Sequence, residues 1–148
     1  MAKNLEPQFY WDPETGLSTC ILSDGTNTYI GQAHCSEADQ DMKSEKTGGY
    51  IAECRAQISY LTHIRDNEIK PKLAALKELY YSINQSKRFN PDLYEVHMLQ
   101  KKIGDLDFEL SVTKDMIATE RKTLNTFMKQ KADAYSKIRR NRESAKNN

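Results

Sequence analysis

The sequence predicts an α+β fold, in which a small N-terminal antiparallel β-sheet is followed by a long antiparallel two-helix hairpin that oligomerises through its helices. Short apolar segments separated by turn residues occupy the first 35 positions, a pattern typical of strands. Apolar residues then recur every three or four positions through most of the remaining chain, as in amphipathic helices. We therefore expect a single structural unit with an N-terminal arm and sheet in residues 1–43 and the helical hairpin in residues 44–148.

The sheet is predicted to contain three short strands in meander order. Residues 17–22 and 28–35 form two of them, and Asp24-Gly25 between them accepts the positive φ of a tight hairpin. Phe9-Tyr10-Trp11 supplies the third strand. A sheet this small cannot bury enough apolar surface alone, so it must pack on a helix. Alternation in residues 28–35 predicts one face with Ile30, Gln32 and His34, and an opposite face with Tyr29, Gly31, Ala33 and Cys35.

The first long helix is predicted from about residue 44 to 85. Ser36 is expected to cap a short helical turn before it, and Ser44 to Thr47 provides the second start. Pro71 disfavours the helical conformation at Lys70, which predicts a kink or brief break there. The apolar stripe of this helix consists of Ile51, Cys54, Ile58, Leu61, Ile64, Leu73, Leu76, Tyr80 and Ile83.

The second helix is predicted from about 91 to 142, with Asn90 as its cap and Pro91 at its first position. Its apolar residues follow a near-heptad spacing that Glu120 and Lys131 interrupt. Because this helix is longer than the first, its end must cover the sheet, meet another subunit or remain free, and the extended seam argues against a free end. The seam consists of Val96, Leu99, Ile103, Leu106, Leu110, Thr113, Ile117, Leu124, Phe127, Ala134 and Ile138.

Aromatic residues exceed what a two-helix hairpin needs internally, with 8 Tyr, 4 Phe and 1 Trp. A second apolar face therefore predicts a dimer or higher oligomer, with helices packing across subunits. The alternative is that the tyrosines lie at the surface with their hydroxyl groups in water. The residues that could form the second face are Tyr80, Tyr81, Phe108, Phe127 and Tyr135.

Composition and motifs exclude several classes of protein. No apolar stretch approaches the roughly 20 residues of a membrane span, and the N-terminus lacks the apolar core of a secretion signal, so we expect a cytoplasmic protein with no membrane partner. Three cysteines without a CxxC pair suggest reduced, buried thiols. Nucleophile-elbow, zincin, P-loop and dinucleotide-binding motifs are missing from the sequence. We therefore expect no catalytic residues, no metal and no cofactor.

The charge distribution points to binding instead. Residues 121–148 carry nine basic and two acidic residues, a net charge of +7, which leaves −6 on residues 1–120. Such a basic end suits an anionic ligand or a complementary subunit. A solvated helix end is the alternative, because the helix dipole alone favours one or two basic residues at a C-terminus.

Arginines supply the candidate ligand-binding residues. Arg139, Arg140 and Arg142 fan around the helix end beside Glu143, and guanidinium groups bind phosphates bidentately. Arg55 lies near the sheet at the start of the first helix. These residues suit a compact nucleotide; for nucleic acid a longer basic stripe is expected, so we do not expect that partner. Further hydrogen bonds could come from Asn125 and Arg121, and stacking surface from Tyr29, Tyr50 and Tyr60.

Residues 29–58 resemble a family of small phage proteins, the first-described class of anti-Thoeris proteins. The resemblance lies in a strand G-x-A-x-C pattern, an acidic turn, S-E-x-x-G and I-A-x-x-R-A; beyond these residues only the layout agrees. The matching segments are Tyr29-Ile30-Gly31-Gln32-Ala33-His34-Cys35, Asp39-Gln40-Asp41, Ser44-Glu45-Lys46-Thr47-Gly48 and Ile51-Ala52-Glu53-Cys54-Arg55-Ala56.

The resemblance implies a function. Members of that family have a small N-terminal sheet and a helical hairpin, assemble as dimers or trimers of dimers, and bind a cyclic ADP-ribose isomer in the infected bacterial cytoplasm without cleaving it. Some also hold cyclic oligonucleotide signals. Their pocket uses an arginine of the first helix, to which Arg55 corresponds, and an arginine with an acidic neighbour at the end of the last helix. Arg142 and Glu143 fit the latter, with Arg139 or Arg140 as alternatives, and Asn125 fits an amide contact.

Two other functions remain open on the sequence. A protein-binding inhibitor of a bacterial defence complex, similar to an anti-CRISPR protein, would use the helical hairpin to occlude its partner and would need no pocket. A coiled-coil phage protein that binds nucleic acid should show salt-dependent binding.

Overall fold

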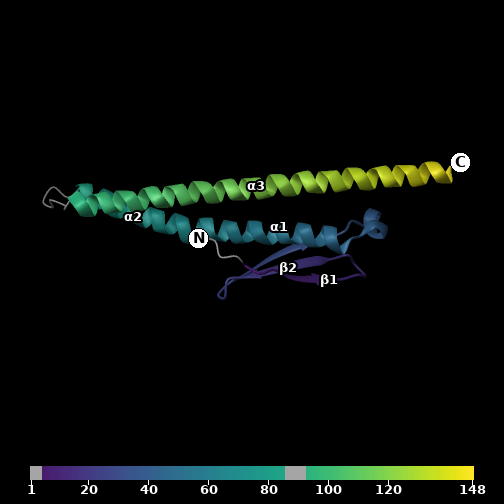
Figure 1. Cartoon of the computed structure of the whole chain (residues 1–148), viewed down its shortest axis with the longest axis horizontal. Helices are drawn as coiled ribbons and strands as arrows, with labels where there is room; N and C mark the ends of the chain where they lie inside the picture. The colour runs from purple at the N-terminus through teal and green to yellow at the C-terminus, as the bar shows by residue number, and fades with distance from the viewer. Residues whose placement is uncertain (1–4, 86–92) are drawn as a thin grey trace. The chain divides into compact units, whose positions relative to one another are not determined.

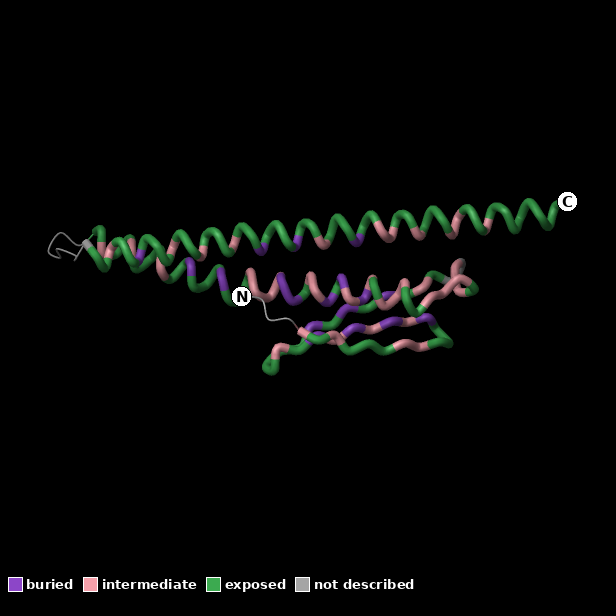
Figure 2. Tube along the Cα trace, viewed as in Figure 1, coloured by how far each residue is buried: buried purple, intermediate pink, exposed green. Residues whose placement is uncertain are grey.

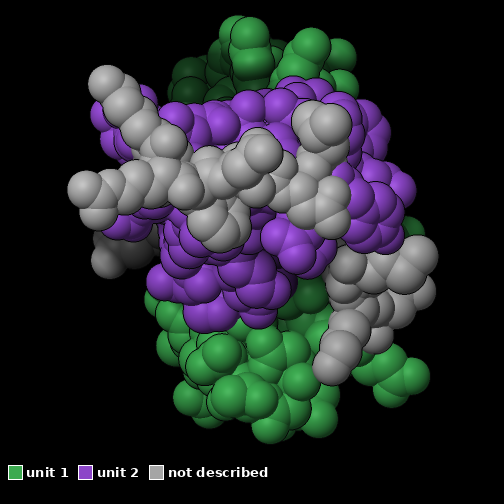
Figure 3. Space-filling view, turned by 90° about the vertical axis from the view of Figure 1, so that its left-hand side faces the viewer, with its two compact units in different colours: residues 1–60, 119–148 green, residues 61–118 purple. Residues whose placement is uncertain are grey.

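The computed structural model describes residues 5–85 and 93–148, and it has the predicted α+β architecture (Figure 1). Two compact units can be separated, unit 1 with residues 1–60 and 119–148 and unit 2 with residues 61–118 (Figure 3). The predicted cap at Asn90 and helix start at Pro91 lie outside the described residues. The elements are β1 (Gln8–Trp11), β2 (Ser18–Ser23), β3 (Thr28–Ala33), the 3₁₀ helix η1 (Glu37–Met42), α1 (Glu45–His63), the π-helix η2 (Ile64–Ile69), α2 (Lys70–Gln85) and α3 (Leu93–Lys146).

The three strands form an antiparallel meander in the order β1-β2-β3, as predicted. The turn between β2 and β3 uses Gly25 at a φ of +92°, and the Asp24 carboxylate accepts hydrogen bonds from the backbone of Thr26 and Asn27 at 2.8 and 2.6 Å. The predicted alternation along β3 is confirmed, because Tyr29, Gly31 and Ala33 are buried while Thr28, Ile30 and Gln32 are exposed.

The buried face of the sheet packs on α1 at very close range (Figures 1 and 2). A Cβ placed on Gly31 would overlap the carbonyl oxygen of Ala52 and the backbone nitrogen of Ala56. A Cβ placed on Gly48 would likewise overlap the hydroxyl oxygen of Ser18. Ala52 and Ala56 are fully buried, so small residues on both elements set the distance between strand and helix.

Within unit 1, α1 lies between the sheet and the C-terminal part of α3 (Figure 1). The rings of Tyr50 and Phe127 join α1 to α3, with centroids 4.5 Å apart, and Leu124 is buried. On the other side of α1, the rings of Tyr29 and Tyr60 meet edge to face at 5.0 Å. This arrangement gives three layers, the sheet, α1 and α3, with the core between them.

The two predicted helix starts differ in outcome. Ser44 accepts a hydrogen bond from the Thr47 N–H at 3.2 Å and so caps α1, as expected. Ser36 precedes η1 but makes no capping hydrogen bond through its side chain. Its hydroxyl instead donates to the Asp39 carboxylate at 2.7 Å, so the prediction of a Ser36 cap was wrong.

In unit 2 a kink or brief break was predicted at Lys70, and the break is wrong, because Lys70 is helical at φ −58° and ψ −45°. The chain instead adopts the π-helix η2 just before Pro71, and the Lys70 N–H bonds to the Arg65 carbonyl. Wider π-turns accommodate local strain in a helix. In an α-helix a proline ring clashes with the carbonyl four residues earlier. The wider π-turn relieves that clash, so the helix continues through Pro71.

The apolar seam of α3 follows the prediction as far as Phe127. Leu99, Ile117 and Leu124 are buried along it, and buried Thr113 donates its hydroxyl to the Glu109 carbonyl at 2.8 Å. Beyond Phe127 the expected continuation is wrong, because Ala134 is exposed and Ile138 is 40% exposed. There a different set of α3 residues, which includes Met128, Lys131 and Tyr135, faces the start of α1 and η1.

Replacing Gly31 with alanine should destabilise the protein by about 3 kcal/mol, since the added methyl group meets backbone atoms that cannot rotate away. Gly49→Ala is the matched control, because a Cβ there meets only Phe9 at an ordinary 3.9 Å. That change should stabilise α1 by about 0.5–1 kcal/mol, through the helix propensity of alanine. Chemical denaturation measures both, and equal effects would contradict the close-packing argument.

Candidate functional site

One face of the C-terminal part of α3 carries the residues that matter for a binding site. Spacings of three and four residues place them on one side of the helix, and we call them the C-terminal stripe. The middle of the stripe is apolar or aromatic, whereas both ends are polar. In order along α3 it consists of Arg121, Asn125, Met128, Ala132, Tyr135, Arg139 and Arg142.

A pocket of about 200 Å³ lies against the middle of this stripe, within unit 1. Met128, Ala132 and Tyr135 form its α3 wall together with Lys131. The opposite walls come from the segment after β3, from η1 with the following loop, and from the first turns of α1; they include His34, Cys35, Ser36, Asp39, Lys43, Ser44, Thr47 and Ile51. The pocket therefore presents ammonium groups, hydroxyls, one imidazole and a tyrosine ring.

Arg55 does not line the pocket, but it contacts a residue that does. Its Nη1 donates to the Gln32 carbonyl at 2.6 Å, and its Nη2 lies 3.8 Å from the Sδ of the pocket residue Met128. The side chain is exposed. A guanidinium fixed by a carbonyl and a sulfur keeps further donors for an anion.

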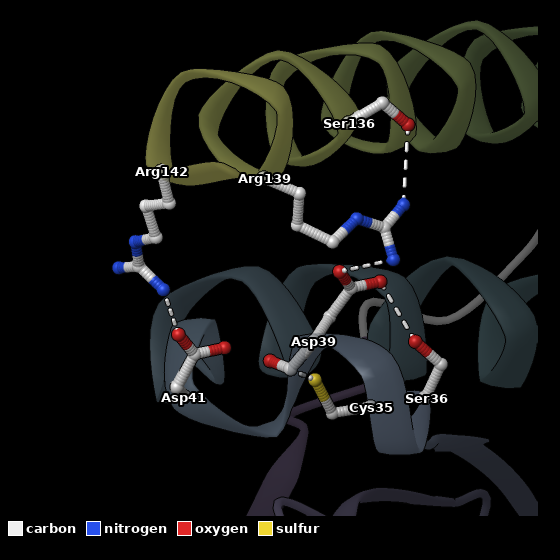
Figure 4. A network of polar contacts seen from close by, with 7 residues as sticks. All are labelled: Cys35, Ser36, Asp39, Asp41, Ser136, Arg139 and Arg142. Carbon is white, nitrogen blue, oxygen red and sulfur yellow. Dashed lines mark hydrogen bonds and ion pairs between the residues drawn. The ribbon is translucent and has the colours of Figure 1, made fainter. Parts of the chain in front are cut away.

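Arg139 does not line the pocket either, but it contacts the lining residue Asp39 where α3 passes over η1 (Figure 4). Its Nη1 lies 3.2 Å from the Asp39 Oδ1, and its Nη2 donates to the Ser136 hydroxyl at 3.2 Å. Arg142, one turn further on, pairs with Asp41. The basic end of the chain and the acidic turn near residue 40 are therefore electrostatic partners, and the end of α3 is held against η1.

Cys35 is the thiol in the pocket wall, and its surroundings favour the protonated form. Partial burial is the main cause that raises its pKa, and the Asp39 carboxylate adds to it, whereas Lys43 acts in the opposite direction. Its Sγ donates to the Asp39 carbonyl oxygen at 3.0 Å. Burial also raises the pKa of the Cys20 thiol, to about 11. A protonated, hydrogen-bonded thiol is a poor nucleophile.

The structure brings only part of the predicted site together. Arg55 and Arg139 each contact a residue that lines the pocket, but Arg142 lies 14 residues beyond Met128, about 21 Å along the helix axis. A single compact nucleotide cannot reach both Arg55 and Arg142 of one chain. Asn125, one turn before Met128, is exposed.

Arg140 and Glu143 fall outside this arrangement. Arg140 points about 120° away from Met128 around the helix and is exposed. Glu143 is exposed as well. Their roles as ligand-binding residues stay predictions.

None of the residues that line the pocket was selected from the sequence as ligand-binding; those most relevant to an anionic ligand are Lys43, Thr47, Lys131 and Tyr135. Lys131 could have been selected from the sequence, because it interrupts the apolar seam. Its ammonium group lies 5.5 Å from the Phe127 ring centroid. Tyr135 was expected on an intersubunit face instead. Lys43 and Thr47 gave no signal, because lysine and threonine near a helix start are unremarkable.

Comparison with models of protein families, with curated proteins and with solved structures finds no match. In the part of the chain that the structure describes, no group of three or more His, Cys, Asp or Glu side chains is arranged to hold a metal ion. Across the same residues, none of the helices combines the length and apolar content needed to cross a membrane.

The pKa of Cys35 gives a test of the electrostatics in this wall. Asp39→Asn removes a charge that raises the pKa, so more thiolate forms at neutral pH and alkylation by iodoacetamide should accelerate. Lys43→Gln removes a charge that lowers the pKa and should slow the same reaction. Mass spectrometry of the labelled peptide measures both rates. Acceleration in both variants would indicate local opening rather than an electrostatic effect.

Proposed function

We propose that this protein binds a cyclic nucleotide immune signal, in the first place a cyclic ADP-ribose isomer, and sequesters it without cleavage. The observation that carries the proposal is the pocket with the ammonium groups of Lys43 and Lys131 in its walls. Arg55 and Arg139 lie beside it, where they contact its lining residues Met128 and Asp39. Cationic donors in the walls and beside them suit a ligand with more than one phosphate. The resemblance of residues 29–58 to phage anti-Thoeris proteins supports the same class of ligand.

The size of the pocket indicates which part of the ligand it would enclose. At about 200 Å³ it is smaller than the roughly 300–1,000 Å³ of pockets that bury whole drug-sized ligands. We assign the enclosed part to a phosphate with its ribose, whose hydroxyls would meet Ser36, Ser44 and Thr47. The base would then lie toward the pocket mouth, where the rings of Tyr135 and His34 offer stacking surface.

Sequestration, rather than turnover, is supported by the state of the pocket thiol. The raised pKa of Cys35 and its hydrogen bond to the Asp39 carbonyl keep it protonated. Asp39, the carboxylate that lines the pocket, is engaged by the Ser36 hydroxyl and by Arg139. These groups are occupied in holding η1 and α3 together. We further propose that the protein acts as a homo-oligomer in the cytoplasm of an infected bacterium.

Calorimetry against cyclic ADP-ribose isomers and cyclic di- and trinucleotides tests the proposal. We expect tight binding of at least one of these signals, and intact ligand on chromatography after the complex is heat-denatured. Recovery of an altered nucleotide would make the protein an enzyme. No binding to any member of the panel would contradict the proposal and favour an inhibitor that binds a protein.

Lys131→Ala should weaken the binding about 10- to 100-fold, since one charge-assisted contact contributes roughly 1.5–3 kcal/mol. Arg55→Ala should have an effect of similar size. Lys129→Ala is the matched control, because Lys129 is an exposed lysine of the same helix that does not line the pocket. Equal affinities of the Lys131 and Lys129 variants would show that the ligand binds elsewhere.

A further inference from the structure

The part of α3 in unit 2 carries a second line of apolar side chains, and these are exposed. Phe108 is 72% exposed and Tyr94 69%, and Met98 and Val112 are exposed as well. Spacings of four and three residues place these side chains on one line of the helix, together with Lys101 and Asp105. We call this line, Tyr94, Met98, Lys101, Asp105, Phe108 and Val112, the outer stripe.

The outer stripe is distinct from the buried seam of the same helix. Leu99, Thr113 and Ile117 of the seam are buried, and they lie roughly 140° around the helix from the outer stripe at 3.6 residues per turn. The seam is therefore satisfied within the unit while the outer stripe faces away from it. Exposed apolar residues at heptad spacing along a helix are the pattern of a coiled-coil contact.

The order of residues along the outer stripe is self-complementary. In an antiparallel pair centred at residue 103, Tyr94 faces Val112 of the second copy and Met98 faces Phe108. Lys101 then faces Asp105, and the two-fold axis repeats every pair. Two ion pairs thus lie at the centre of the contact, flanked on each side by two apolar layers.

A parallel pair would lose this match. Each residue would face its own copy, so that Lys101 would meet Lys101 and Asp105 would meet Asp105, and like charges at such positions are destabilising. The charge order therefore selects the antiparallel register. It also explains why a lysine and an aspartate interrupt an otherwise apolar line, since polar residues in a seam specify partner and register.

We propose that the outer stripe is the surface through which two copies of this chain pair, antiparallel, about residue 103. This names the contact for the homo-oligomer proposed above. It does not depend on the ligand, because all six residues belong to unit 2 and the pocket belongs to unit 1. Self-association measured without ligand can therefore fail or succeed independently of sequestration.

A charge exchange on the full-length protein tests the contact. Lys101→Asp places two pairs of aspartates opposite each other and should weaken self-association at least about tenfold in analytical ultracentrifugation. Asp105→Lys should do the same with lysines, and the double variant should restore the wild-type behaviour. Both positions are exposed, so the fold should be kept, which circular dichroism verifies. A monomeric wild type, or an assembly that the single exchanges leave unchanged, would overturn the proposal.

Disulfide crosslinking tests the register separately. Protein carrying Met98→Cys, mixed with protein carrying Phe108→Cys, should form a bond between residues 98 and 108 that peptide mass spectrometry identifies. The Met98→Cys protein alone serves as the control and should not link to itself through residue 98. Links between identical positions would indicate a parallel pair and overturn the antiparallel register.

Discussion

The close approach of β3 to α1 is the constraint on which unit 1 depends. Gly31 has no side chain because the backbone of α1 occupies the space where one would be, and Ala52 and Ala56 keep that backbone near. This contact fixes the end of β3 beside the first turns of α1. It thereby places Cys35 and Thr47 in one wall, and the pocket exists because the sheet and the helix meet at this distance. The small residues that carry the resemblance to phage anti-Thoeris proteins are largely those that build this contact, so the resemblance describes the frame of the site more directly than its ligand.

Structural features that depend on interactions between neighbouring residues could be predicted from the sequence. The two-residue alternation of β3, the turn at Gly25 and the cap at Ser44 depend on neighbouring residues alone, and all three are present. The predictions were wrong where the local sequence allows more than one structure. Lys70 stays helical because a π-turn, rather than a break, accommodates the proline that follows it. Ile138 continues an apolar period, but the period says nothing about where the opposing helix begins, and α1 starts only at Glu45.

The charged residues near the site could be identified from the sequence, but their arrangement in space could not. The acidic turn around Asp39 and the basic end around Arg142 were each visible, yet they were interpreted separately, since 101 residues separate Asp41 from Arg142 along the chain. Their pairing changes the interpretation of both. The aspartates are counterions of the arginines, and a ligand beside Arg139 must compete with a carboxylate already in place. Among the described residues, the contacts of Arg55 are with a carbonyl and a thioether, which makes it the more available anion-binding group beside the pocket.

The helix α3 presents different faces along its length, and this division bears on how sequestration would work. Its C-terminal stripe contributes one wall of a pocket whose other walls come from the same chain. Its outer stripe lies in the other unit and offers a self-complementary surface. Under the two proposals, pairing of two chains would neither complete a pocket nor block one, and it would place identical sites on one particle. The capacity of a protein that sequesters a signal would then scale with the number of chains. Its affinity would be set within each chain by the pocket residues and by Arg55 and Arg139 beside them.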